Sequence, residues 1–273
     1  MNNPSKKISV LLPTRGRTDA LLRSVASLVT HSTDPGQVEF LLAFDNDDVE
    51  SFKWFEENIV PTLESAGSDY TCYGYEPLGY IRLNEYVNSL AEHATGNWLL
   101  FWNDDAVMQT KGWDQIIAEH TEFAVLRMPA HNEHPYAVFP VVPRQWLDMC
   151  GYLSKHQLSD AWISQIAYLL DIMVNIPIEV LHDRFDITGN NNDSTFKKRP
   201  MLEGNHTNPR DFNYRSYRQD RFNDAIKIAT ILKAQGRDMT WFDNVLAGKQ
   251  DPWVKMTDAT HDPNQQLSRY INK

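Results

Sequence analysis

Four short strand-like segments constrain the fold of this chain more than any other feature of its sequence. They are ISVLL, VEFLLAF, YTCYGY and NWLLFW, which begin at residues 8, 38, 70 and 97. The stretches between them, residues 18–32, 49–64 and 80–96, carry apolar side chains at helical spacing. Alternating strands and helices are typical of a sheet with helices on both faces, and continuous apolar strands are typical of parallel pairing. We therefore predict an α/β, Rossmann-like, mostly parallel sheet flanked by helices.

The order of elements changes after Gly112. The sequence predicts a short helix over 113–120, two strands in FAVLRM and YAVFPVV, helices from about residue 143 and over 159–173, and a strand in IPIEVL. Residues 183–209 show no periodicity and are predicted to be a loop, whereas residues 211–235 have the pattern of a polar helix. The chain therefore divides into residues 1–110, residues 111–209 and a helical C-terminal extension over 210–273.

Composition limits the classes of partner. The 273 residues carry a formal net charge of -10, so the chain is a poor candidate for binding nucleic acid through its phosphates. No apolar stretch approaches the length of a membrane span, and the run after Lys7 is too short for a signal peptide. Cys72 and Cys150 are far apart and form no CxxC motif, which favours a reduced, cytoplasmic location over a disulfide scaffold.

Polar residues follow three of the predicted strands at the points where they end. These are Pro13-Thr14-Arg15-Gly16-Arg17, Asp45 to Asp48, and Asn103-Asp104-Asp105. Ligands of open α/β sheets bind outside the carboxyl ends of the strands, so we expect the three loops to converge. Two adjacent aspartates both stay charged only where water or a cation compensates them. A solvated turn is one interpretation of Asp104 and Asp105, and a divalent-metal site is the other.

The motifs ISVLLPTRGR, FLLAFDNDD and YIRLNEYVNSLAEHATGNWLLFWNDDA, in this order, resemble GT-A fold glycosyltransferases, and specifically the inverting family 2. The resemblance implies that residues 1–110 are the nucleotide-sugar-binding half of a GT-A domain and residues 111–209 its acceptor-side half. It implies donor contacts for Pro13, Thr14, Arg15, Arg17, Asp45, Asp47, Arg82 and Asp104. A surface arginine remains an equal interpretation of Arg82.

The same resemblance implies a divalent cation, Mn²⁺ or Mg²⁺, at the segment NDD. Its ligand would be Asp105, while Asn103 stands where the family usually has a first aspartate. Some relatives use a histidine after the last strand as a second metal ligand, and His182 holds that position here; a structural histidine is the alternative. A hard cation with oxygen ligands would neutralise the charge that develops on the leaving diphosphate.

The segment GYLSKHQLSDAWISQIA resembles the part of the family in which an acidic residue at a helix start acts as general base. Asp160 is the match, although Ser159 replaces the glutamate that often precedes it. The alternative is that Asp160 only complements the dipole of a helix capped by Ser159. The implied activity is inverting transfer of a sugar from a nucleotide-sugar to a glycan, lipid-linked, protein or small-molecule acceptor.

Three other functions place different demands on the sequence. A sugar nucleotidyltransferase would need a glycine-rich loop with a lysine after the first strand, and PTRGR has a single glycine. A dinucleotide-dependent oxidoreductase would need GxGxxG there, and the chain lacks it. A non-catalytic GT-A-like protein that binds carbohydrate or acts in an assembly remains open, because the sequence alone does not exclude it.

Overall fold

The computed structural model describes residues 8–129, 135–183, 188 and 212–254, and its centre is a seven-stranded sheet. Across the sheet the strands are β3 (Asp69–Tyr75), β2 (Val38–Asp45), β1 (Ile8–Pro13), β4 (Trp98–Phe101), β7 (Val141–Pro143), β6 (Val125–Arg127) and β8 (Met173–Asn175). The first four are parallel, β7 is antiparallel to β4 and β6, and β8 is parallel to β6. Two further strands, β5 (Ala106–Met108) and β9 (Val180–His182), form an antiparallel ribbon.

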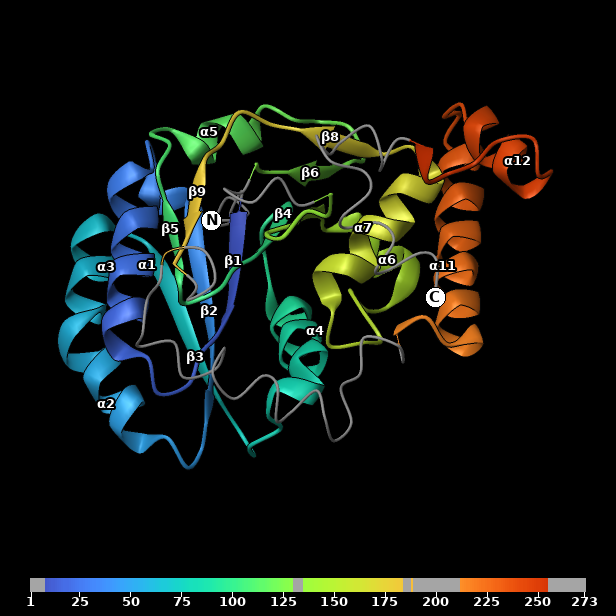
Figure 1. Ribbon diagram of the computed structural model, residues 1–273. Helices are drawn as coiled ribbons and strands as arrows, with labels where there is room; N and C mark the ends of the chain where they lie inside the picture. The colour runs from blue at the N-terminus through green and yellow to red at the C-terminus, as the bar shows by residue number, and fades with distance from the viewer. Residues whose placement is uncertain (1–7, 130–134, 184–187, 189–211, 255–273) are drawn as a thin grey trace.

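Helices cover both faces of the sheet (Figure 1). One face carries α1 (Thr18–His31), α2 (Val49–Asn58) and α3 (Val60–Ala66), with the short helices η1 (Pro35–Gln37) and α5 (Trp113–Ala118) nearby. Val10 and Leu12 of β1 pack into the cluster beneath α1, whereas Leu11 packs into the cluster on the opposite face. Because alternate side chains of β1 are buried on both faces, the strand is apolar throughout.

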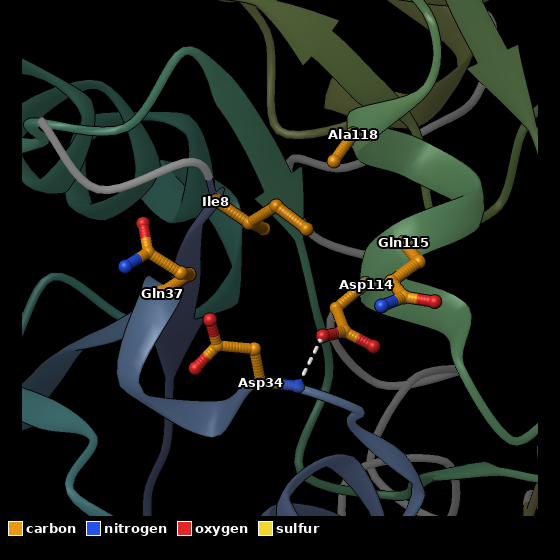
Figure 2. Close-up of a pocket in the computed structure, with 6 residues that line it drawn as sticks. All are labelled: Ile8, Asp34, Gln37, Asp114, Gln115 and Ala118. Carbon is orange, nitrogen blue, oxygen red and sulfur yellow. Dashed lines mark hydrogen bonds between the residues drawn. The ribbon is translucent and has the colours of Figure 1, made fainter.

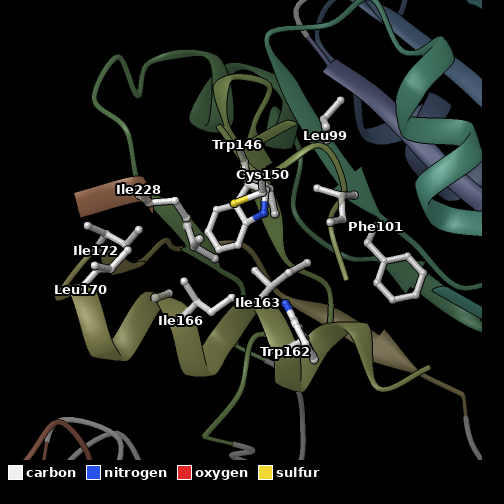
Figure 3. Close-up of a cluster of buried hydrophobic side chains, with 14 of the residues drawn as sticks. Leu99, Phe101, Trp146, Cys150, Trp162, Ile163, Ile166, Leu170, Ile172 and Ile228 are labelled. Atoms are coloured by element: carbon white, nitrogen blue, oxygen red, sulfur yellow. The ribbon is translucent and has the colours of Figure 1, made fainter. Parts of the chain in front are cut away.

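The second face carries α4 (Leu83–His93), α6 (Gln145–Cys150) and α7 (Ser159–Leu170). α11 (Arg215–Ala234) packs against α6 and α7 on their outer side and is followed by α12 (Thr240–Leu246). Figure 3 shows how Trp146, Ile166 and Ile228 meet in the core that these helices share. α7 packs against β6 and β8 and also against α11, so nearly all of its side chains are buried. None of the helices in the described residues is long and apolar enough to cross a membrane.

The predicted fold class is confirmed, and the differences are local. The sequence predicts a helix in part of residues 49–64 that Pro61 breaks or kinks; the structure has two helices there, α2 and α3, with Pro61 in the first turn of α3. The helix predicted over 159–173 ends at Leu170, because Asp171 adopts a left-handed conformation (φ 56°) and the chain continues into β8. The boundary between residues 209 and 210 and most of the predicted loop over 183–209 lie outside the described residues.

Candidate active site

The carboxyl ends of β1, β2 and β4 lie side by side. Pro13 pairs with Ala43, and the backbone N–H of Thr14 continues this pairing by donating to the Ala43 carbonyl at 3.0 Å. On the other side of β1, Trp102 N–H donates to the carbonyl of Leu11 at 3.0 Å. These bonds bring the loop after Pro13 next to the loops that follow β2 and β4.

Asp104 and Asp105 share one guanidinium. Arg17 Nε donates to Asp104 Oδ2 at 3.2 Å, its Nη1 donates to Asp105 Oδ2 at 3.0 Å, and its Nη2 forms an ion pair with Asp104 Oδ1. Thr14 Oγ1 donates to Asp104 Oδ2 at 2.8 Å. Asp104 is 1% exposed and Asp105 8% exposed, so the first and third predicted loops meet at a buried, charge-compensated acidic pair rather than at a solvated turn.

The two aspartates differ in acidity. Burial raises the pKa of Asp104 to about 6, although the charge of Arg17 opposes the shift; the neighbouring Asp105 carboxylate adds to it. Burial also acts to raise the pKa of Asp105, but the His182 imidazole and the Arg17 guanidinium outweigh it and lower that pKa to about 2. Asp105 is therefore the member of the pair that stays ionised throughout the neutral range.

His182 lies against Asp105 because the β5–β9 ribbon places it there. Ala106 pairs with His182, and the N–H of Asp183 donates to the Asp105 carbonyl at 2.8 Å. His182 Nε2 lies 3.2 Å from Asp105 Oδ1, and the ring packs edge-on against Phe139. Among the described residues, Asp105 Oδ1 has no hydrogen bond of ordinary geometry.

Asp105 and His182 fit a divalent cation as neighbouring ligands. Octahedral ligands at about 2.1 Å from Mg²⁺ lie about 3 Å from each other when adjacent, and the observed separation of Asp105 Oδ1 and His182 Nε2 is 3.2 Å. No group of three or more His, Cys, Asp or Glu side chains in the described residues is arranged to hold a metal. Such a cation would therefore need water or ligand oxygens as well, which is common for Mg²⁺.

The loop after β2 is held by Arg15. Its guanidinium donates to the carboxylates of Asp45 and Asp47, which raises the pKa of Arg15, mainly through Asp47. Asp45 is buried, whereas Asp47 is 53% exposed. The N–H of Gly16 donates to Asp48 at 2.8 Å. The structure therefore brings Arg15, Asp45 and Asp47 together next to Pro13, where β1 ends.

Arg82, another predicted donor contact, lies on the surface on α4's N-terminal side, away from the contacts of Arg15 and Arg17 with the aspartates. It ends the short helix η2 (Tyr80–Arg82), after Gly79 with its positive φ of 71°. The Arg82 side chain is 51% exposed, and its guanidinium forms an ion pair with Glu85, three residues further along the chain. A donor contact by Arg82 stays a prediction.

Asp160 lies at the same end of the sheet as the three loops. β6 is antiparallel to β7, which is antiparallel to β4, so β6 and β8 run in the direction of β4. α7 packs on β6 and β8 and leads directly into the start of β8. Its C-terminal end is therefore at the amino end of β8. The half-buried Asp160, in the first turn of α7, lies toward the carboxyl ends.

Two side chains of α4 bind the end of β2 and the segment before α7. The sequence analysis did not predict a role for either of them. Tyr86 donates to Asp45 Oδ1, and Asn88 holds the segment before Asp160. Asn88 Oδ1 accepts the N–H groups of Leu153 at 2.9 Å and Ser154 at 3.1 Å. A hydroxyl-bearing aromatic on the apolar stripe of a helix usually has a buried polar partner, so Tyr86 could have been noticed.

A cavity at the other end of β1 has a structural explanation (Figure 2). It is lined by Ile8, Asp34, Gln37, Asp114, Gln115 and Ala118. The buried Asp114 carboxylate accepts the N–H groups of Thr33 and Asp34, both at 2.8 Å, and so joins α5 to the end of α1. Because Ile8 begins β1, this cavity lies opposite the loops described above.

Comparisons with known proteins identify the fold. No family model and no curated protein matches the sequence. S. aureus TarS 1-349 in complex with UDP-GlcNAc matches over 97% of this chain and 76% of that chain, with 13% identity and a TM-score of 0.55. Mannosyltransferase PcManGT from Pyrobaculum calidifontis, in complex with GDP-Man and Mn²⁺, matches over 93% and 84%, with 11% identity and a TM-score of 0.50. The fold is GT-A-like.

The GT-A-like fold accounts for the order of the predicted motifs along the sheet. Membership of family 2 stays a prediction. In other comparisons the chain spans 36% of the length of TarS, 58% of TarS 1-349 and 60% of its UDP complex. At these identities the likeness concerns the fold. The chemistry has to be argued from the side chains at the carboxyl ends of β1, β2 and β4.

Proposed function

We propose that this protein is a glycosyltransferase that moves a sugar from a nucleotide-sugar to an acceptor hydroxyl with inversion at the anomeric carbon. The observation that carries the proposal is the cluster at the carboxyl ends of the strands, in which the half-buried Arg17 joins the buried side chains of Thr14, Asp104, Asp105 and His182. It combines fixed cationic and anionic groups at the place where open α/β sheets bind ligands. The neighbours with this fold were solved with UDP-GlcNAc and GDP-Man.

The donor would lie across the loops after β1 and β2. Asp45 and Asp47, held by Arg15 beside Pro13, offer carboxylate acceptors to the hydroxyl and N–H groups of a nucleoside. Arg17 offers a planar guanidinium to the diphosphate, and such groups bind phosphate oxygens well. Asp104, held by Thr14, is placed to accept from a sugar or ribose hydroxyl. Arg82 would make a further contact with a phosphate or the ribose of the donor.

Asp105 and His182 would hold the divalent cation, Mn²⁺ or Mg²⁺. When bound, such a cation neutralises the charge that develops on the leaving diphosphate. Asp105 suits this role because it is ionised at neutral pH. The remaining ligands would be donor oxygens and water. The Mn²⁺ bound to PcManGT is consistent with a cation at this fold.

Asp160 would act on the acceptor. Its carboxylate takes the proton of the acceptor hydroxyl, whose oxygen attacks the anomeric carbon from the face opposite the diphosphate. The bond from that carbon to the diphosphate breaks, and its electron pair leaves with the nucleoside diphosphate. A glycan, a lipid-linked sugar, a protein or a small molecule could supply the hydroxyl. The cytoplasmic location stays a prediction.

A thermal-shift experiment tests the donor assignment. UDP, GDP, CDP and dTDP are added with and without Mn²⁺ to wild type, Asp105→Ala and the control Asp243→Ala, which alters an exposed aspartate on α12 paired with Lys233. One diphosphate should stabilise wild type and the control, with an additional Mn²⁺-dependent shift that Asp105→Ala lacks. Equal shifts in all three proteins would contradict the metal assignment. No shift with any diphosphate would contradict the proposed function.

A further inference from the structure

The hydroxyl of Tyr86 joins two parts of the donor side of the sheet. Tyr86 lies in the second turn of α4 and is 6% exposed. Its Oη donates to Asp45 Oδ1 and accepts the N–H of Leu78 at 2.7 Å. One buried hydroxyl therefore connects the last residue of β2 with the segment between β3 and η2.

The Asp45 carboxylate is held from two sides. Tyr86 occupies Oδ1, and Arg15 Nη1 donates to Oδ2. A carboxylate has about four acceptor positions, so these two bonds fix the plane of the group and leave positions for another donor. Asp45 is 6% exposed, which limits the directions from which such a donor can approach. An acceptor fixed in this way suits a hydroxyl or N–H of a nucleoside.

The bond to Leu78 extends the effect of Tyr86 to the neighbouring segment. Leu78 directly precedes Gly79, whose φ of 71° turns the chain into η2. At the other end of the segment, Asn46 N–H donates to the Tyr75 carbonyl at 2.7 Å, and Asn46 Nδ2 donates to Glu76 Oε1 at 3.3 Å. Asp45, Asn46 and the segment from Glu76 to Gly79 thus form one hydrogen-bonded unit, with Tyr86 beneath it.

We propose that Tyr86 is a positioning residue for nucleotide recognition, which acts by fixing the Asp45 carboxylate toward the nucleoside. This inference rests on the proposed function, because it assigns Asp45 to the nucleotide. Tyr86 does not itself bind the nucleotide. Its contribution to affinity passes through Asp45 and therefore disappears when residue 45 has no side-chain oxygen that can accept from Tyr86.

A double-mutant cycle on nucleotide affinity tests the proposal. The variants are Tyr86→Phe, Asp45→Ala and the double variant, and the dissociation constants of UDP, GDP, CDP and dTDP are measured by calorimetry with Mn²⁺ present. Hydrogen bonds to charged groups are the stronger ones, so Tyr86→Phe should weaken binding about ten-fold or more in the wild-type background. In the Asp45→Ala background, where Tyr86 has no side-chain oxygen to donate to at residue 45, the same change should alter the affinity by less than about two-fold.

Tyr75→Phe is the matched control. The Tyr75 ring packs against Tyr86 at a centroid distance of 5.3 Å, and its hydroxyl donates to Ser89 rather than to Asp45. The change therefore removes the same atom from the neighbouring ring, and the affinity should stay within about two-fold of wild type. Tyr86→Phe keeps the aromatic ring and its packing. Urea unfolding of each variant measures its stability, so that a loss of stability can be separated from a loss of nucleotide affinity.

The outcomes separate the inference from the proposed function. If wild type binds one of the four diphosphates and Asp45→Ala weakens that binding, but Tyr86→Phe behaves like Tyr75→Phe, the positioning role is wrong and the proposed function stands. Equal effects of Tyr86→Phe in both backgrounds would also overturn the positioning role, because an effect that passes through the Asp45 side chain cannot survive removal of its oxygens. If wild type binds none of UDP, GDP, CDP and dTDP, the proposed function fails and the inference fails with it.

Discussion

Asp104→Asn should stabilise the protein at alkaline pH, although it alters a buried side chain of the candidate site. Asp104 is 1% exposed, and burial raises its pKa from 3.8 to about 6. Holding this carboxyl ionised therefore costs folding free energy above pH 6. Each pKa unit corresponds to 1.36 kcal/mol, so a shift of about two units amounts to ~3 kcal/mol. Asparagine resembles the neutral carboxyl in shape and avoids this cost.

The sign follows from proton linkage. Because the folded-state pKa of Asp104 lies above 3.8, its proton-linked stability is fully present below pH 3.8 and is lost as the pH rises through about 6. The pKa of Asp105 shifts in the opposite direction, so the contribution of this carboxylate to folding stability is lost only as the pH falls from 3.8 toward 2. The difference in stability between Asp104→Asn and wild type, compared at pH 5 and pH 8, therefore reports on Asp104, because other groups that titrate in this range are common to both proteins. The gain from Asp104→Asn should be ~1–3 kcal/mol at pH 8, since the amide also weakens the contact with Arg17, and smaller at pH 5.

Urea unfolding with EDTA at both pH values measures the effect, and Asp114→Asn is the control. Asp114 is another buried aspartate, but its carboxylate accepts two backbone N–H groups at 2.8 Å. An amide cannot accept both without turning its own NH₂ toward a donor, so this variant should lose about 1.5–3 kcal/mol. The assigned cost of ionising Asp104 would be refuted if Asp104→Asn destabilised the protein at pH 8. It would also be refuted if the difference in unfolding free energy between the variant and wild type were the same at pH 5 and pH 8.

Three further predictions concern individual side chains. Asp105→Asn and His182→Ala should each weaken Mn²⁺ binding by about ten-fold or more, because the first removes the negative charge of one protein ligand and the second removes an imidazole ligand; unchanged Mn²⁺ titrations would exclude that ligand. Asp160→Asn should lower the transfer rate by roughly 10²–10⁴ while nucleotide affinity stays near wild type, and a near-normal rate would remove it from the mechanism. Burial raises the pKa of the Cys72 and Cys150 thiols to about 12, so the native protein at pH 8 should react slowly with iodoacetamide and the unfolded protein quickly; fast labelling of native protein would contradict the burial.

Local patterns in the sequence were sufficient to predict the parallel half of the sheet. Each of β1, β2 and β4 is buried on both faces and therefore reads as an apolar run, and the residues that follow them are polar because they lie at the ligand-binding edge. The convergence of Arg17 with Asp104 follows from this topology alone. The short strand β8 could not be predicted, since its pairing with β6 is a tertiary contact that no local periodicity reports.

The contacts that orient the site were less accessible to sequence analysis. His182 reaches Asp105 only because β5 and β9 pair across a long stretch of chain, so a lone histidine in the sequence gave no geometric information. Tyr86 and Asn88 lie on α4 at positions that helical spacing assigns to the apolar stripe or its border. Their roles depend on the groups that face them from β2 and from the segment before α7. Periodicity identifies a buried face, but it does not show which polar group is buried opposite.

The most direct test of the account is donor consumption. Purified protein is incubated with Mn²⁺ and with a panel of UDP-, GDP-, CDP- and dTDP-linked sugars, and release of the nucleoside diphosphate is followed by chromatography, with water as the acceptor when no other is known. We predict that wild type and Asp243→Ala slowly release the nucleoside diphosphate from one of these donors and that Asp105→Ala does not. If wild type neither binds nor consumes any of these donors, or if Asp105→Ala releases the diphosphate at the wild-type rate, the proposed site is contradicted.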